Sequence, residues 1–213
     1  MKKSILALCA LTLAAGLSAC GGGTSSYTVG GTVSGLVFPG LVLTNNLSDD
    51  VAVAPLPVEN GNARNVSYQF SKQLDYGDPY SVTIKTQPQH QVCEPSSTPG
   101  NVTADTAGRL SVINAVFICT LASHTIGGSI SGLAADGLTL NNGGSTLPVV
   151  KDTTTGAYPT SFTFPTVVTY KQTYGVTVLD QPTGQTCRVA NGAGEMGDEN
   201  ITSISITCTT NPA

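Results

Sequence analysis

The segment Tyr27-Thr28-Val29-Gly30-Gly31-Thr32-Val33-Ser34-Gly35-Leu36 returns 97 residues later as His124-Thr125-Ile126-Gly127-Gly128-Ser129-Ile130-Ser131-Gly132-Leu133. Six of the ten positions are identical, and the Gly-Gly pair is among them. At an offset of 94, two more segments recur: Tyr80-Ser81-Val82-Thr83-Ile84 as Tyr174-Gly175-Val176-Thr177-Val178, and Gln87-Pro88 with Gln91 and Cys93 as Gln181-Pro182 with Gln185 and Cys187. Repetition of this density predicts two homologous domains, at residues 27–121 and 123–213.

Within each repeat, apolar residues alternate with polar ones over short segments such as Tyr80 to Ile84, and no stretch sustains helical spacing. Turn dipeptides such as Asn60-Gly61 and Asn142-Gly143 separate the segments. The composition agrees, with 24 Gly, 12 Pro and only 10% charged residues. We expect an all-β chain of two tandem β-sandwich domains. A coiled coil, a helical bundle and a multi-pass membrane protein are disfavoured.

The formal net charge is −4, and loss of residues 1–19 with Lys2 and Lys3 would leave 7 − 13 = −6. An acidic chain of this kind is a poor match for phosphate backbones. We therefore expect no nucleic-acid partner.

The N-terminus carries an export signal. Basic Lys2 and Lys3 precede an apolar run of 13 residues from Ile5 to Leu17, which is too short to span a bilayer as a helix. The run ends in Leu17-Ser18-Ala19-Cys20, which resembles the bacterial lipobox. The resemblance implies cleavage after Ala19, a diacylglyceryl group on the Cys20 thiol and an acylated new amino terminus. An ordinary signal peptide with a free Cys20 is the alternative.

Residues 1–19 are thus a predicted lipoprotein signal peptide, and residues 20–26 a lipidated cysteine with a flexible Gly/Ser tether. In the lipoprotein family an Asp after the cysteine favours inner-membrane retention, and here that residue is Gly21. The resemblance implies an outer-membrane protein of the cell envelope, bound to the membrane through Cys20. It does not say whether the domains face the periplasm or the cell surface.

Taken whole, the repeat resembles the Gly-Gly-Thr-Val-Ser-Gly-Leu … Tyr-x-Val-Thr-Val … Gln-Pro-x-x-Gln-x-Cys … Cys unit of proteobacterial surface lipoproteins, from Tyr27 to Thr209. This resemblance implies an Ig-like or transthyretin-like sandwich, and it brings no catalytic residue and no settled ligand. The segment from Leu74 to Val82 also resembles the tyrosine corner of Ig-like sandwiches, in which a Tyr hydroxyl bonds to the backbone.

Six cysteines are present, of which Cys9 lies in the signal peptide and Cys20 is the lipidation site. The other four permit three pairings. Only one pairing is symmetric within the repeats: Cys93 with Cys119, and Cys187 with Cys208. An exported protein can keep such disulfides. The alternative is a zinc site made by all four cysteines, but it lacks Cys-x-x-Cys spacing.

No catalytic constellation stands out. The two histidines, His90 and His124, correspond to Gly184 and Tyr27 in the other repeat, and no Gly-x-Ser-x-Gly motif is present. Acidic residues in the loop of Glu195, Asp198 and Glu199 lack the spacing of a calcium loop. We expect no enzyme activity, no cofactor and no metal site, with these acids solvated.

Exposed aromatic rings can stack on sugar faces, so Tyr76, Tyr158 and Tyr170 are candidate ligand-binding residues. Tyr76 and Tyr170 occupy equivalent repeat positions, which a shared structural role also explains. With no Trp and 6% aromatic residues, half-buried strand residues are the simpler interpretation.

The sequence therefore favours a non-catalytic, outer-membrane-anchored lipoprotein. It would present two disulfide-bonded β-sandwich domains for envelope structure or for adhesive contact with other proteins at the cell surface, as a candidate bacterial antigen. The alternative is a periplasmic or surface module that binds a glycan or another small ligand. A hydrolase would need His90 or His124 beside both a serine and a carboxylate.

Overall fold

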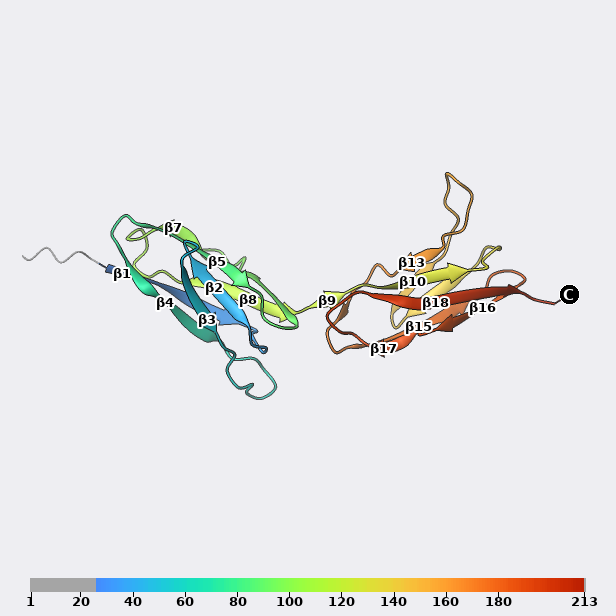
Figure 1. The fold of residues 1–213 in the computed structure, drawn as a ribbon, viewed down its shortest axis with the longest axis horizontal. Coiled ribbons are helices and arrows are strands. Elements are labelled where there is room, and N and C mark those ends of the chain that lie inside the picture. The colour runs from blue at the N-terminus through green and yellow to red at the C-terminus, as the bar shows by residue number, and fades with distance from the viewer. Residues whose placement is uncertain (1–25, 213) are drawn as a thin grey trace, which may run out of the picture.

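A computed structural model describes residues 26–212, which form eighteen β-strands and contain no α-helix. Figure 1 shows two groups of strands arranged end to end and joined by a single crossing of the chain. We call β1 to β8 the first domain and β9 to β18 the second domain. Each has its own hydrophobic core, the first running from Val29 to Cys119 and the second from Ile126 to Cys208.

Each domain is a sandwich of two four-stranded sheets. In the first domain one sheet has the order β4-β1-β8-β6 and the other β3-β2-β5-β7. The strands are β1 (Ser26–Ser34), β2 (Leu41–Asn45), β3 (Asp49–Val53), β4 (Val66–Asp75), β5 (Pro79–Thr86), β6 (Gln91–Pro95), β7 (Ala104–Thr106) and β8 (Ala115–Leu121).

The second domain repeats this plan with the sheets β13-β10-β18-β16 and β12-β11-β15-β17, and it adds a small pair, β14-β9. Its strands are β9 (Ser123–His124), β10 (Ile126–Ser131), β11 (Thr139–Asn142), β12 (Ser145–Pro148), β13 (Ser161–Thr163), β14 (Val168–Thr169), β15 (Thr173–Asp180), β16 (Gln185–Ala190), β17 (Ala193–Glu195) and β18 (Ile201–Thr210). The expected all-β sandwich class is therefore confirmed.

The strand order differs from the immunoglobulin sandwich. There the first two strands share a sheet and the third lies in the other sheet. Here β2 pairs with β3, while β1 lies in the opposite sheet between β4 and β8. Of the two topologies that the family resemblance implied, the immunoglobulin arrangement is not the one adopted.

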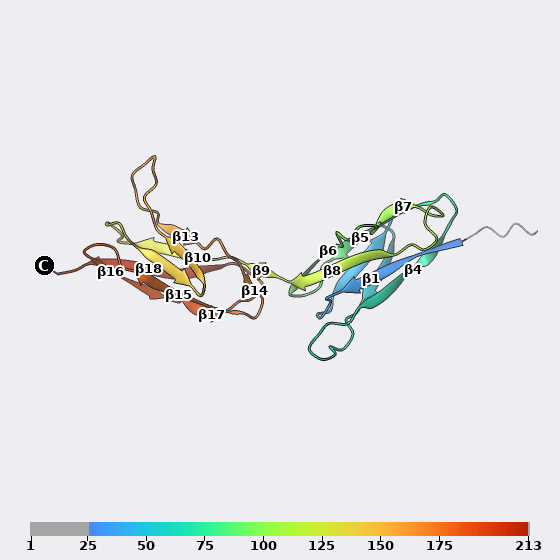
Figure 2. The same cartoon turned by 180° about the vertical axis from the view of Figure 1, so that it is seen from behind.

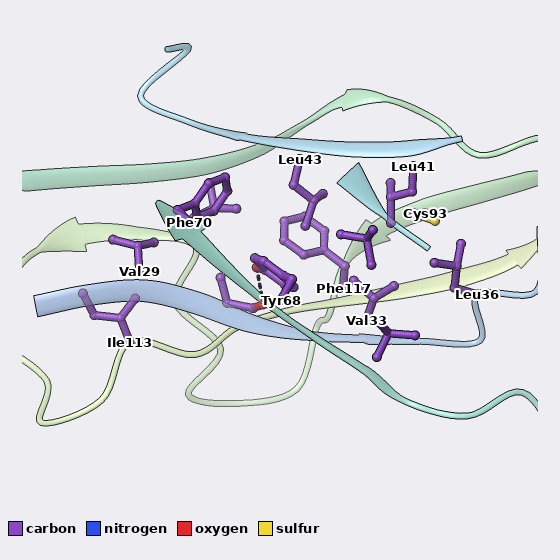
Figure 3. Packing of buried hydrophobic residues seen from close by; sticks show 14 of the residues in the cluster. Val29, Val33, Leu36, Leu41, Leu43, Tyr68, Phe70, Cys93, Ile113 and Phe117 are labelled. Carbon is purple, nitrogen blue, oxygen red and sulfur yellow. Dashed lines mark hydrogen bonds between the residues drawn. The ribbon is translucent and has the colours of Figure 1, made fainter. Parts of the chain in front are cut away.

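Alternating side chains build the core, as the period of two predicts. Figure 3 shows Val29 and Val33 of β1, Leu43 of β2 and Phe117 of β8 directed into the space between the sheets. Phe117 and Leu43 are completely buried. A fully buried side chain of this size stabilises a domain by about 1.5–3 kcal/mol relative to an exposed one.

Tyrosines do not form the expected corner. Tyr76 is 74% exposed, and the buried Tyr80 hydroxyl has no hydrogen-bond partner among residues 26–212. The tyrosine that bonds to the backbone is Tyr68 in β4, whose hydroxyl donates to the Ala115 carbonyl at 2.7 Å. The resemblance of the Leu74–Val82 segment therefore does not extend to a hydroxyl–backbone bond.

The Gly-Gly pair explains the central position of β1. A Cβ on Gly30 would overlap the Tyr68 carbonyl oxygen of β4, and a Cβ on Gly31 would overlap the Ala115 carbonyl oxygen of β8. In the second domain, Gly127 and Gly128 face the carbonyls of Phe162 and Ile204 in the same way. Each pair thus lets one strand lie close to both of its neighbours.

We predict that Gly128→Ala lowers the free energy of unfolding of the second domain by about 1–3 kcal/mol, because the added methyl group must displace backbone. Gly175→Ala is the matched control: Gly175 lies in β15, and its Cβ would meet nothing within 4 Å. That change should stay within about 0.5 kcal/mol of the wild type. Urea unfolding measures both, and equal losses would contradict the close approach.

Both predicted disulfides are present, Cys93–Cys119 and Cys187–Cys208. In each case the two cysteines stand directly opposite each other on antiparallel strands, β6 with β8 and β16 with β18. All four side chains are at least 95% buried. Each bond therefore ties an edge strand of the sandwich to the last long strand of its domain.

Replacing both cysteines of one pair by alanine should destabilise that domain by about 3–3.5 kcal/mol, the chain-entropy value for closed loops of this length. Loops of 26 and 21 residues predict nearly equal losses. Because the cores are separate, each double variant should shift the thermal transition of its own domain, measured by calorimetry. A shift of both transitions by one variant would argue against separate folding units.

Candidate functional site

The connection between the domains is one residue, Ala122, between the end of β8 and the start of β9. Its N–H donates to the His90 carbonyl of the first domain at 2.9 Å. Its own carbonyl accepts from the Tyr170 N–H of the second domain at 2.8 Å. Since both backbone groups of the linker residue are bonded to the domains that it joins, the connection is held on both sides.

Three aromatic rings meet beside this connection. The rings of His90 and Tyr170 stack with centroids 4.1 Å apart and planes 8° apart. Phe38 stands edge-on to both, at 4.9 Å from His90 and 5.8 Å from Tyr170. Stacked and edge-to-face pairs of this kind add about 0.5–1.5 kcal/mol each beyond the area they bury. His90 and Phe38 come from the first domain and Tyr170 from the second.

Charged groups orient the same contact. His90 Nδ1 lies 2.7 and 2.8 Å from the two carboxylate oxygens of Asp198, in the loop before β18. Lys171 places its Nζ 5.8 Å from the centroid of the Tyr170 ring. The Asp198 side chain is 54% exposed, so the pair contributes little to stability, about 0–1 kcal/mol. Its effect is to fix the direction in which the His90 ring points. We call the five residues Phe38, His90, Tyr170, Lys171 and Asp198 the junction.

Two junction residues adopt a backbone conformation that favours glycine. His90 has a φ of 57° and Lys171 a φ of 66°. The equivalent residues of the other repeat are Gly184, with a φ of 67°, and Gly77, with a φ of 93°. A side chain at such a position costs roughly 1–3 kcal/mol. The His90 side chain contacts Tyr170 and Asp198 of the other domain, whereas the Lys171 side chain lies by the ring of its neighbour Tyr170 within the second domain. Both residues differ from the other repeat, so the junction is a specific feature of this chain.

Neither histidine is paired with a side chain that it could activate as a nucleophile in the part of the chain that the structure describes. No hydroxyl or thiol is hydrogen-bonded to His90 or to His124 among residues 26–212, and His124 Nε2 is buried without a partner. Nor does this part of the chain gather three or more His, Cys, Asp or Glu side chains in a way that could hold a metal ion. The contacts that the structure shows at the junction join the first domain to the second.

The three candidate tyrosines have different surroundings. Tyr170 lies in the junction, so its ring faces are engaged. Tyr158 donates its hydroxyl to Asp136 Oδ1 at 2.7 Å, and Lys151 Nζ lies 4.8 Å from its ring centroid. The hydrogen bond to Tyr158, followed by the nearby Asp136 charge, raises the pKa of Lys151 above its ordinary value. Tyr158 therefore anchors the loop between β12 and β13.

Tyr76 is the exposed member of the set. Its nearest aromatic partner is Tyr27, with centroids 6.4 Å apart. The structure does not bring the three tyrosines together, because Tyr76 lies in the β4–β5 turn of the first domain, Tyr170 in the junction and Tyr158 on a loop of the second domain. They do not form a common platform.

Sequence reasoning named Tyr170 as a ligand-binding candidate and not as an interdomain contact, and it missed Phe38, Lys171 and the pairing of His90 with Asp198. A signal was available at two of these positions. His90 and Lys171 each replace a glycine of the other repeat, and a side chain placed where the other copy has glycine indicates a local requirement. The proposed lipidation site Cys20, the signal peptide and the tether up to residue 25 lie outside the described residues.

Comparisons with protein-family models and with curated proteins found no match to this chain. Residues 26–212 include no helix long and apolar enough to cross a membrane.

We predict that His90→Gly, which restores the residue of the other repeat, frees the two domains to move independently. It removes the ring stack and the contact with Asp198, while glycine suits the positive φ, so the first domain should keep its unfolding midpoint. Rotational diffusion from NMR relaxation should change from one body to two. Tyr158→Phe, outside the junction, is the control and should leave tumbling unchanged. Retained joint tumbling in His90→Gly would show that the stack does not hold the domains.

Proposed function

We propose that this protein is a non-catalytic lipoprotein, anchored in the bacterial outer membrane through Cys20, that carries its second domain away from the membrane for envelope structure or contact with other proteins. One observation supports a spacer of this kind. The chain enters the first domain at one end and leaves the second at the opposite end (Figures 1 and 2). The lipobox resemblance supports the anchor, and the junction supports a fixed direction.

The geometry of the histidines gives a hydrolase no support. His90 faces a carboxylate, as a catalytic histidine would, but its ring face is covered by Tyr170. A triad needs a serine hydroxyl on the second ring nitrogen, and none is hydrogen-bonded there in the described part of the chain. The His90–Asp198 contact is better explained by domain orientation.

Glycan binding is also less well supported. Sugar-binding rings must present a flat face to solvent, whereas Tyr170 is stacked on His90 and Tyr158 is held by Asp136 and Lys151. Of the three, only Tyr76 remains exposed, and the Tyr27 ring beside it is tilted by 52° and does not extend a flat surface. We therefore prefer the spacer to the glycan-binding module.

The anchor is tested by Cys20→Ser, which removes the thiol that would be acylated. We predict that wild-type protein fractionates with outer membranes and that the variant moves to the soluble envelope fraction, because lipidation supplies membrane affinity of about 0.8 kcal/mol per buried CH₂. Cys9→Ser, within the proposed signal peptide, is a matched control that should leave fractionation unchanged. A Cys20→Ser variant that stays in the membrane fraction would exclude the lipid anchor.

Orientation is tested by protease on intact cells. A role in surface contact predicts that the two domains are shed from intact cells, with cutting in the tether before β1. Shedding only after permeabilisation would rule out adhesion and leave the structural role within the envelope. Immunoblots against each domain distinguish release of the whole chain from loss of the second domain alone.

A further inference from the structure

Exposed apolar side chains surround the start of β1. Tyr76 is 74% exposed, Val112 is 73% exposed and Leu110 is 38% exposed. The Tyr76 ring lies over Gly108, at the head of the loop that carries the other two residues. Val112 lines a shallow hollow together with Thr28 of β1, and Leu110 lines the adjoining one. We call Tyr76, Leu110 and Val112 the apolar rim.

The rim is held in place by backbone hydrogen bonds. Gly77 donates to the Ala107 carbonyl at 3.0 Å, and Ala107 donates to the Asp78 carbonyl at 2.8 Å. The β4–β5 turn and the loop after β7 are thus joined to each other. Ser26, the first residue of β1, pairs with Asp75 beside them. In Figure 2, β7 lies at the end of the domain at which β1 begins. The rim therefore has a fixed position at this end.

In the second domain, the surface equivalent to the apolar rim contacts the neighbouring domain. Tyr170, the equivalent of Tyr76, lies against His90 and Phe38 of the preceding domain. In the second domain the loop at this end carries the polar Asp198, which also contacts the first domain. In the first domain the segment between the two cysteines is longer, 26 against 21 residues, and it carries Leu110 and Val112. The first domain therefore presents an apolar surface at the position where the second domain contacts the first.

The short tether keeps the apolar rim close to the membrane that would hold the lipid anchor. Cys20 and Ser26 are six residues apart, so the lipid-bearing cysteine can lie at most about 20 Å from the start of β1. We propose that the apolar rim docks on the lipid bilayer that holds the anchor, with the three side chains at headgroup level. This inference rests on the proposed lipid anchor. A tyrosine ring suits that depth because its body is apolar and its hydroxyl remains hydrated.

Charge defines the kind of bilayer surface. The charged residues nearest to the rim residues along the sequence are Lys72, Asp75, Asp78, Asp105 and Arg109, three acids against two bases. One excess negative charge fits a zwitterionic headgroup layer better than a strongly anionic one.

A second copy of the chain is a poorer partner for the apolar rim than the bilayer. Its second domain has Ala135 and Gly184 in place of Phe38 and His90, so it lacks the aromatic residues on which Tyr170 packs.

The experiment uses tryptophan as a depth probe, since the chain has none. Full-length Tyr76→Trp protein is expressed in a bacterial host, purified with its lipid and reconstituted in phosphatidylethanolamine–phosphatidylcholine vesicles with or without brominated acyl chains. We expect bromolipid to quench the emission at least about twofold, because an interfacial ring lies within reach of the upper acyl chain. Val112→Trp should behave alike. Leu179→Trp, 56% exposed on β15 of the second domain, is the matched control and should not be quenched.

The outcomes separate the docking from the anchor. Protein that fails to float with vesicles would refute the lipid anchor, and the docking with it. Protein that floats while both rim tryptophans remain unquenched would refute the docking alone. A blue shift that depends on protein concentration and needs no vesicles would identify a second copy as the occupant, against the proposal. Adding Leu110→Asp and Val112→Asp to Tyr76→Trp should abolish the quenching, whereas persistent quenching would show that the rim is not the docking surface.

Discussion

The close passage of β1 between its two neighbours is the constraint on which each sandwich depends. β1 pairs with β4 in antiparallel fashion and with β8 in parallel fashion, and it is the parallel pair that joins the two ends of the domain sequence. Adjacent glycines serve the two sides, Gly30 toward β4 and Gly31 toward β8. Register irregularities occur at this place in both domains. Any side chain at these positions would push one neighbour away and open the sheet.

Two buried glutamine side chains stabilise the turn that follows the first strand of each sandwich. Gln91 accepts from the N–H groups of Val37 and Phe38 and donates to the Gly35 carbonyl, 2.7–3.0 Å in each case. Gln185 makes the equivalent three bonds in the second domain. The turn itself is only partly buried, but the two glutamine side chains that bond to it are about 95% buried, and a buried polar group left unpaired costs about 1–3 kcal/mol. The repeated Gln-Pro-x-x-Gln-x-Cys motif is therefore a device for closing the turn after β1 beside the disulfide.

Sequence patterns predicted the local structure and the pairing of the cysteines, but not the sheet order. Alternation of apolar and polar residues shows which face of a strand is buried. It does not show which other strand lies beside it in the sheet. The partner of Ser34, Ile118, is 84 residues away, and nothing local identifies it. Tyr76 and Tyr170 illustrate the same limit at the surface. They occupy equivalent repeat positions, yet Tyr76 is exposed and Tyr170 is stacked on His90. The difference comes from the residues that surround each ring, which the repeat pattern does not predict.

The repeats differ mainly at the ends of the domains, where one copy contacts the other domain and the equivalent residues of the other copy do not. Residues that close the sandwich are the same in both copies, as with the glycine pair and the two glutamines, because both cores impose the same demands. Residues at the ends differ: the turn of His90 contacts the second domain, while the equivalent turn of Gly184 contacts no other domain within residues 26–212. A histidine in that conformation is less stable than glycine, so its presence has to be offset by contacts across the junction. The order of the two domains is therefore reflected in the few positions at which the repeats differ, and His90 in place of Gly184 is the one that makes the contact between them.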